Sequence, residues 1–237
     1  MTPTSQPAMP APERTLRTAA RLTAATGAAN AVLLLVSFGI LRTTPLPTSP
    51  DEEFTAYYGG PDRRWVILAG LYLMPFAAIA FIWFVVALRM RVSSPGSRED
   101  VLFSNVQLVS GIAFISLLLV GAAAYSVDAA LAELTDVPLE PTFARQFPQY
   151  GSVLVLALAM RMAAVFVIAT SSIGRHLRVL PAWFVWLGFV VGAFLLLAAT
   201  LNVALVVVFP MWMLTLCGLL LVRTRRIAAG PPPVPDP

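Results

Sequence analysis

Arg161 is the residue whose type and position most directly suggest chemistry. It lies near the middle of an apolar run, residues 151–173, that contains no acidic residue. A guanidinium group at the centre of a bilayer costs roughly 2.5–3.5 kcal/mol on insertion scales. The fold must therefore supply a partner on another helix, a water-filled cavity or a bound anion.

Few other polar side chains fall within or beside apolar runs, and they are the other candidates for a binding site or for contacts between helices. Asn105 and Gln107 lie near one end of their run, and Asp128 lies just beyond the other end. Arg161, in a helix of opposite direction, sits between those levels, and its long side chain can reach several ångströms toward either. The substrate-binding or helix-locking candidates are Arg161, Asn30, Tyr72, Asn105, Gln107 and Asp128.

The residue types that most enzymes and cofactor sites need are missing from the sequence. A single histidine, His176, excludes bis-histidine haem binding and leaves a histidine-based metal site without ligands. The sequence has no glycine-rich phosphate loop and no His-Glu-x-x-His motif. Cys217 is the only cysteine, so no intramolecular disulfide can form. We therefore expect no catalytic residue, no metal, no cofactor and no enzymatic activity.

The composition is that of an integral membrane protein. Hydrophobic residues make up 58% of the 237 residues and charged residues 12%, an excess that several membrane spans require and a soluble core does not. All 16 basic residues are arginines, and the net charge is +4. Because the arginines cluster at the ends of apolar runs rather than along one face, we reject nucleic acid as a partner and expect the lipid bilayer instead.

Apolar runs of about 20 residues, the length that crosses a bilayer, predict an all-α polytopic fold with six transmembrane helices. The last run, residues 181–222, is too long for one crossing, because a single helix of that length would be about twice as long as the hydrocarbon core is thick. Its central polar break at residues 200–202 predicts a tight hairpin. The six expected spans are residues 22–41, 65–88, 101–125, 151–173, 182–199 and 203–222.

Two tails flank this transmembrane domain, which we place at residues 22–224. Residues 1–21 are rich in Pro, Thr and Ala and predict a disordered basic tail, and residues 225–237 form a Pro-rich tail. The strongly apolar part of the first span, residues 31–41, is short and follows arginines, as in a signal peptide. The segment after it lacks a small-x-small cleavage site, which favours an uncleaved first helix.

The arginines also predict the orientation of the chain. Eleven fall on one side of the six-span arrangement and four on the other, and cytoplasmic loops carry the excess of basic residues. Both termini are therefore expected inside, in a multi-pass protein of the cytoplasmic membrane. The eleven are Arg14, Arg17, Arg21, Arg89, Arg91, Arg98, Arg175, Arg178, Arg223, Arg225 and Arg226, and the four are Arg42, Arg63, Arg64 and Arg145.

The two sizeable outer loops predict short interfacial helices. In the first, Ser49 would cap the helix, Pro50 would take the first helical position and Glu52 would complete a capping box. An aromatic face follows, which we expect in the headgroup layer. The second loop carries four acidic residues against one arginine, which indicates a solvated acidic face, with a cation funnel as the alternative. The aromatic residues of the first loop are Phe54, Tyr57 and Tyr58, and Gly59 and Gly60 end its helix.

Gly188 and Gly192 form a small-x-x-x-small seam in the fifth span. Such a seam suits close helix contact, either within the bundle or between protomers, and contact within the bundle is favoured. Pro75 and Pro210 fall inside the second and sixth spans, where they predict kinks that neighbouring groups must accommodate.

Three runs of the sequence carry a resemblance to other proteins. They are PDRRWVILAGLYLMPFAAIAFIWFVVALR, NVQLVSGIAF and ALAMRMAAVFVIATSSIGRHLRVLPAWFVWLGF. These runs resemble a group of small actinobacterial integral membrane proteins of unknown function, and the resemblance covers most of the chain from the first span to the sixth. Similar proteins carry an arginine where Arg161 stands and a Gly-then-Leu-Pro-aromatic turn at residues 174–183. The resemblance implies a six-helix membrane fold and supplies no reaction, substrate or cofactor.

Three classes of function fit these residues. The favoured one is a structural or accessory membrane protein that packs against a second copy or another membrane protein, with Arg161 as a lock between helices. The alternative is a small transporter or channel in which Arg161 faces a cavity and attracts an anion or polar solute. A lipid-modifying enzyme is the weakest. Proton-coupled transport is not expected, because a guanidinium stays protonated and cannot shuttle protons.

Overall fold

Helices make up almost all of the chain that the computed structural model describes, which is residues 11–46, 48–92, 98–135, 140–198 and 204–228. These ranges contain no strand, so the all-α class is confirmed. In chain order the elements are α1 (Ala11–Leu41), α2 (Asp51–Gly59), α3 (Arg63–Ile67), the π-helix η1 (Leu68–Leu73), α4 (Met74–Val92), α5 (Arg98–Leu134), α6 (Pro141–Ala144), α7 (Gln146–Ser152), the π-helix η2 (Val153–Ala159), α8 (Met160–His176), α9 (Ala182–Leu197) and α10 (Ala204–Ala228).

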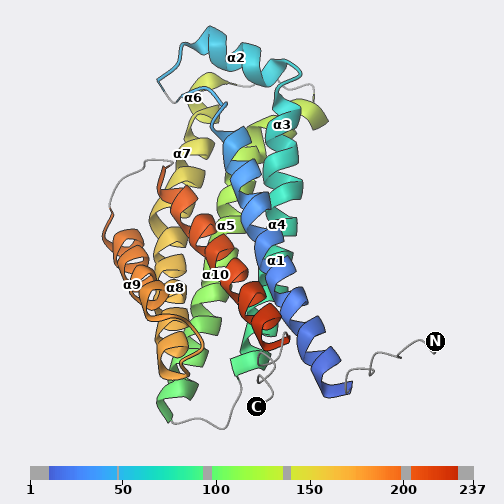
Figure 1. The fold of residues 1–237 in the computed structure, drawn as a ribbon. Coiled ribbons are helices and arrows are strands. Elements are labelled where there is room, and N and C mark those ends of the chain that lie inside the picture. The colour runs from blue at the N-terminus through green and yellow to red at the C-terminus, as the bar shows by residue number, and fades with distance from the viewer. Residues whose placement is uncertain (1–10, 47, 93–97, 136–139, 199–203, 229–237) are drawn as a thin grey trace, which may run out of the picture.

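The long helices run beside one another as a bundle, with α2, α3 and α6 gathered at one end (Figure 1). We call this the α2 end, and the opposite end, which carries the connection between α8 and α9, the turn end. Five segments are long and apolar enough to cross a membrane, and they coincide with five of the six expected spans. They are Arg21–Leu41, Arg63–Met90, Val101–Leu134, Pro141–His176 and Leu205–Arg223.

Helix α9 is the exception among the expected spans. It has 16 residues, so it is about 24 Å long, whereas the hydrocarbon core is about 30 Å thick. The hairpin expected at residues 200–202 lies outside the described residues. At the start of the chain, α1 begins at Ala11, so residues 11–21 of the expected tail are helical, while residues 1–10 lie outside the described part.

Phenylalanine side chains from four helices fill the centre of the bundle. Phe81 of α4 contacts Phe114 of α5 and Phe166 of α8, with ring centroids 5.3 and 5.1 Å apart. Phe209 of α10 packs on Phe114 at 4.9 Å. Each of these four rings is 0–1% exposed. We call them the phenylalanine cluster; aromatic rings of this kind supply large apolar contact area with preferred tilted or edge-to-face geometry.

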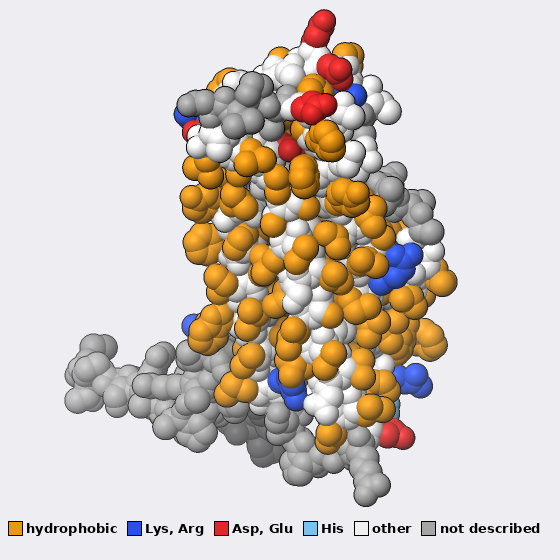
Figure 2. Space-filling view, turned by 180° about the vertical axis from the view of Figure 1, so that it is seen from behind, with side chains coloured by type: hydrophobic (Ala, Val, Ile, Leu, Met, Phe, Trp, Pro, Cys, Tyr) orange, Lys and Arg blue, Asp and Glu red, His pale blue; other side chains and the backbone are white. Residues whose placement is uncertain are grey.

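Apolar side chains also cover the outside of the bundle. Figure 2 shows them along most of its length, with acidic side chains gathered mainly at the α2 end. Trp83, Trp186 and Val190 are 59%, 63% and 64% exposed. A soluble monomer rarely exposes so continuous an apolar surface, and this one is as expected for helices that face lipid.

Both π-helices lie in helical segments that start at the α2 end. Pro75 is the second residue after η1; it has no N–H to donate, and its ring crowds the carbonyl of Leu71, which lies inside η1. The wider π turn accommodates this conflict, as expected for a proline in a membrane helix. No proline follows η2. The second residue after it is Arg161.

Helix α2 is turned with its aromatic side onto the protein. Phe54 and Tyr58 are 2% and 1% exposed, so these two rings contact the protein rather than the headgroup layer in which they were expected. Their rings also pack on each other, with centroids 4.7 Å apart. Burial of this side holds α2 across the end of the bundle and leaves its polar side outward.

The start of α2 is held by Arg145, and the cap that was expected at Ser49 does not form. Pro50 occupies the N-cap position, and no side-chain cap bond forms, which corrects the expected capping box. The guanidinium of Arg145 instead donates to the carbonyl of Ser49 at 2.7 Å and pairs with Asp51. It also lies over the Phe54 ring, 5.6 Å from the centroid. Arg145, which lies between α6 and α7, therefore tethers the start of α2.

The glycine seam of α9 packs against α8. A Cβ at position 188 would lie 1.9 Å from Oγ of Ser171, and one at position 192 would lie 2.4 Å from Cγ1 of Ile168. Both distances are far below van der Waals contact, so only glycine lets the two backbones approach this closely. The contact expected within the bundle is thus confirmed.

Candidate functional site

Arg161 satisfies part of its hydrogen-bonding capacity within its own helix. Its Nη1 donates to the carbonyl oxygen of Ala157. The backbone N–H of Met160 donates to Val155, five residues earlier, so the π turn displaces backbone bonds and brings carbonyls within reach of a side-chain donor. The ion pairs formed by described residues involve Arg63, Arg64 and Arg145 and do not include Arg161. Arg161 is partly buried.

The register between α5 and α8 shows how far Arg161 lies from the polar groups of α5. Gln107 Nε2 donates to Thr170 Oγ1 at 2.7 Å, nine residues beyond Arg161 and so about 13 Å along the helix axis. At the other end the hydroxyls of Tyr125 and Ser152 are hydrogen-bonded. Asp128 lies one turn beyond Tyr125, about 18 Å from the level of Arg161. Arg161 does sit between the two levels, and both are too distant for its side chain.

Arg161 lies level with the place where α9 ends. It lies on the same face of α8 as Ile168, because seven residues make nearly two full turns. Ile168 and Ala164 are the residues that a Cβ on Gly192 would meet. Helices α8 and α9 run in opposite directions, so going forward along α9 from Gly192 corresponds to going backward along α8 from Ala164 and Ile168. Leu197 lies five residues after Gly192, and Arg161 lies a similar distance back along α8. Leu197 and Arg161 are therefore at about the same level. The last carbonyls of a helix lack backbone partners and attract cations.

Two of the other candidates connect neighbouring helices. Asn30 of α1 is fully buried, and its Nδ2 donates to the carbonyl of Ala77 on α4 at 2.9 Å. Gln107 is 2% exposed and joins α5 to α8 through Thr170. Polar side chains in membrane bundles commonly serve such interhelical bonds. These two contacts involve different helix pairs and do not form one site with Arg161.

Tyr72 and Asn105 face the outside of the bundle. Tyr72, in η1, is 56% exposed. Asn105 is exposed, and its Oδ1 accepts a 3.5 Å hydrogen bond from Nη2 of Arg89 on α4. The six candidates therefore lie at different levels and on different faces, and the structure does not gather them around one cavity.

Asp128 is a buried acidic residue that lies beneath α2, close to Tyr58. It is 1% exposed, and its Oδ2 has no hydrogen-bond partner among the described residues. Tyr58 of α2 lies close to it: burial and the nearby Asp128 charge raise the pKa of Tyr58 above its ordinary value. From the sequence, Tyr58 was predicted only as part of an aromatic face. Its place beside Asp128 was not predicted, because no local sequence signal indicates that α2 folds back over α5.

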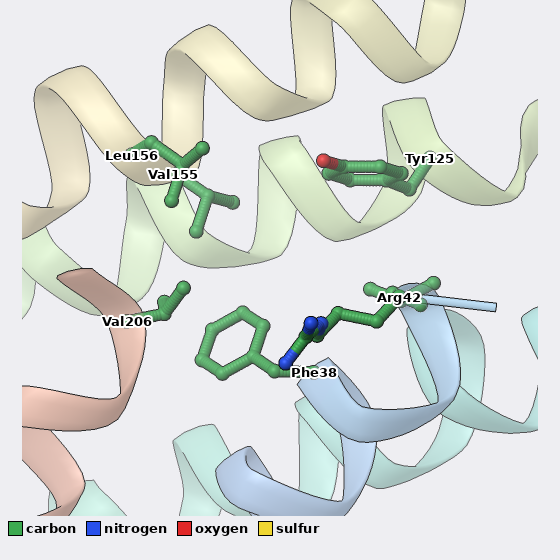
Figure 3. Close-up of a pocket in the computed structure, with 7 residues that line it drawn as sticks. Phe38, Arg42, Tyr125, Val155, Leu156 and Val206 are labelled. Carbon is green, nitrogen blue, oxygen red and sulfur yellow. The ribbon is translucent and has the colours of Figure 1, made fainter. Parts of the chain in front are cut away.

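A small cavity lies at the α2 end. Figure 3 shows the guanidinium of Arg42 next to the Phe38 ring, with Tyr125, Val155 and Val206 around the opening. Its volume of about 40 Å³ accommodates water and no larger solute, because one water needs roughly 10–15 Å³ of such volume. The described part of the chain also holds no group of three or more metal-ligating side chains.

No family model, curated protein or solved structure matches this chain. The resemblance to actinobacterial membrane proteins stays a prediction.

Proposed function

We propose that this protein is a structural or accessory component of the cytoplasmic membrane, which packs against a partner rather than moving a solute. The phenylalanine cluster is the observation that carries the proposal. Its rings come from α4, α5, α8 and α10 and are 0–1% exposed. A conducting path needs water or polar groups at this level, and apolar rings occupy it.

The buried amides support the same function. Asn30 donates a hydrogen bond to the carbonyl of Ala77 on α4 at 2.9 Å, and Gln107 donates one to the hydroxyl of Thr170 on α8 at 2.7 Å. Such bonds fix one helix against the next.

In this proposal all six spans cross the membrane, with the α2 end outside and the turn end in the cytoplasm. The distribution of arginines supports this orientation. Helix α9, at about 24 Å, would cross together with residues on either side of it, or with local thinning of the bilayer. Helices α2 and α6 would then lie at the outer interface.

The partner-binding surface that we propose is the outward side of α2. Asp51, Glu52 and Glu53 are exposed there, and acidic side chains stand out from the α2 end in Figure 2. Because Arg145 and the buried aromatic side hold α2 in place, this acidic surface is presented in a fixed orientation. A second copy or another membrane protein with a basic outer segment would complement it.

Two measurements test this function. Purified protein in proteoliposomes should not raise chloride, nitrate or phosphate flux above that of protein-free vesicles. A photo-cross-linking residue at Glu53 should give a discrete protein adduct in native membranes, whereas the same residue at lipid-facing Val190 should not. Protein-dependent flux that Arg161→Gln abolishes would contradict the proposal.

A second candidate function is anion binding at Arg161, as in a small transporter. The observation that favours it is the position of Arg161, beside a π-helix and level with the end of α9. Helix ends near the middle of a bilayer form ion sites in transporters. Nitrate or chloride should then raise the thermal unfolding midpoint of the wild type and not that of Arg161→Gln. Equal midpoints with and without the anions would remove this candidate.

A further inference from the structure

A groove of about 430 Å³ opens at the turn end, between the α8–α9 connection and the last turns of α10. Two arginines line it, together with a tryptophan and aliphatic side chains, and none of the described lining residues is acidic. We call it the arginine groove. Its main lining residues are Arg178, Leu180, Trp183, Leu219, Val222 and Arg223.

The backbone at Arg178 closes α8 in a Schellman motif. The N–H of Val179 donates to the carbonyl of Gly174 at 3.0 Å, and the N–H of Arg178 donates to Arg175 at 3.2 Å. This bonding pattern places Arg178 at the position just past the helix cap, where the left-handed conformation is required. Its φ is +51°, and it is the only non-glycine residue with positive φ in the described chain.

An arginine at this position is unfavourable for the backbone. Glycine adopts the left-handed region without a Cβ clash and is the usual residue there, whereas other residues are strained. Strained conformations persist only where the surrounding structure holds them, and they cluster at functional sites. Arg178 is also one of the residues that line the groove, so the strain and the groove point to the same residue.

The groove is already formed in the free protein. Arg223 donates from Nη1 to the carbonyls of Arg178, at 3.3 Å, and Val179. Leu180 packs over Gly174, where a Cβ would lie 2.3 Å from its Cδ1. These contacts hold the turn against α10 and fix the guanidinium of Arg223 beside the groove, which Arg178 also lines.

We propose that the arginine groove binds the headgroup phosphate of an anionic phospholipid. Guanidinium groups pair with phosphate through charge-assisted, often bidentate hydrogen bonds. The aliphatic walls and the exposed Trp183 suit the glycerol backbone and first methylenes of a lipid, and tryptophan favours the membrane interface. Basic pockets between transmembrane helices bind anionic headgroups in this way. Free phosphate would use the arginines but not these walls.

The test uses the full-length protein in a neutral detergent and its thermal unfolding midpoint. Short-chain phosphatidylglycerol should raise the midpoint of the wild type, while phosphatidylcholine and inorganic phosphate at equal concentration should not. Arg178→Gly should unfold at the same or a higher temperature than the wild type without lipid, because the strain is relieved, and it should lose most of the phosphatidylglycerol shift.

Arg175→Gln is the matched control, because it removes the same charge from the same turn but does not line the groove. It should keep the full shift. The proposal is overturned if Arg178→Gly keeps the shift, if Arg175→Gln loses it equally, or if inorganic phosphate reproduces it. It is independent of whether the α2 surface binds a partner.

Discussion

Arg161 and Ala157 are hydrogen-bonded within one helix, where η2 passes into α8. The guanidinium inside the apolar run therefore has a neutral partner, a backbone carbonyl that the π turn makes accessible. It is also level with the end of α9, whose last carbonyls lack helical partners. At this position Arg161 can either hold α8 to a neighbouring helix, as a lock, or bind an anion.

Arg161→Leu should fold and insert, with a free energy of unfolding equal to that of the wild type or about 1–3 kcal/mol higher. Replacing a buried charge whose partner is neutral removes a desolvation cost. Thermal unfolding in detergent measures the change, with Arg161→Lys retaining the charge without the planar donor geometry. Failure of Arg161→Leu to assemble would show that Arg161 locks α8 to a neighbouring helix.

Gly188→Ala should destabilise the bundle by about 1–3 kcal/mol, because its Cβ would lie 1.9 Å from Ser171 Oγ and force α8 and α9 apart. Ser171→Ala should restore part of the loss when combined with it. Gly218→Ala is the control, since a Cβ there meets nothing within 4 Å; it should be neutral or slightly stabilising. A wild-type midpoint for Gly188→Ala would disprove the close packing of α9 on α8.

The attachment of α2 should weaken at alkaline pH. Because the pKa of Tyr58 is raised in the folded protein, its contribution to stability is complete below the ordinary tyrosine pKa of about 10 and is lost as pH rises above that value. Proteolysis of the 42–62 segment at pH 9 and pH 11 would measure the change. Tyr58→Phe should abolish the increase in cleavage, whereas the more exposed Tyr57→Phe should retain it.

A topology assay separates six crossings from five. A reporter active only in the periplasm should be silent when fused after Pro235 and active when inserted near Thr135. An active fusion after Pro235 would show that α9 does not cross separately, so that the C-terminus lies outside. Because α9 is short, the fusion after Pro235 is the one that tests whether α9 crosses the membrane as a separate span.

Local patterns predicted several elements well. The two glycines after Tyr58 end α2 as expected, since its last residue is Gly59 and Gly60 caps it. The capping box at Ser49 was wrong: Pro50 occupies the N-cap position without a side-chain cap bond. A more distant residue, Arg145, binds the Ser49 carbonyl and Asp51. A cap is a local signal, but the start of α2 is held by a guanidinium that lies more than 90 residues away in the sequence.

The sequence by itself determined the all-helical class, the five long apolar helices and the isolation of Arg161 within one of them. Hydropathy over about 20 residues is a local property that needs no knowledge of neighbours. Only the tertiary structure decided which groups share a level: the distance of Arg161 from Gln107 and Asp128, the burial of Tyr58 over Asp128, and the groove between Arg178 and Arg223. These depend on helix register and on how the turns fold back, and both are set by packing between segments that lie far apart in the chain.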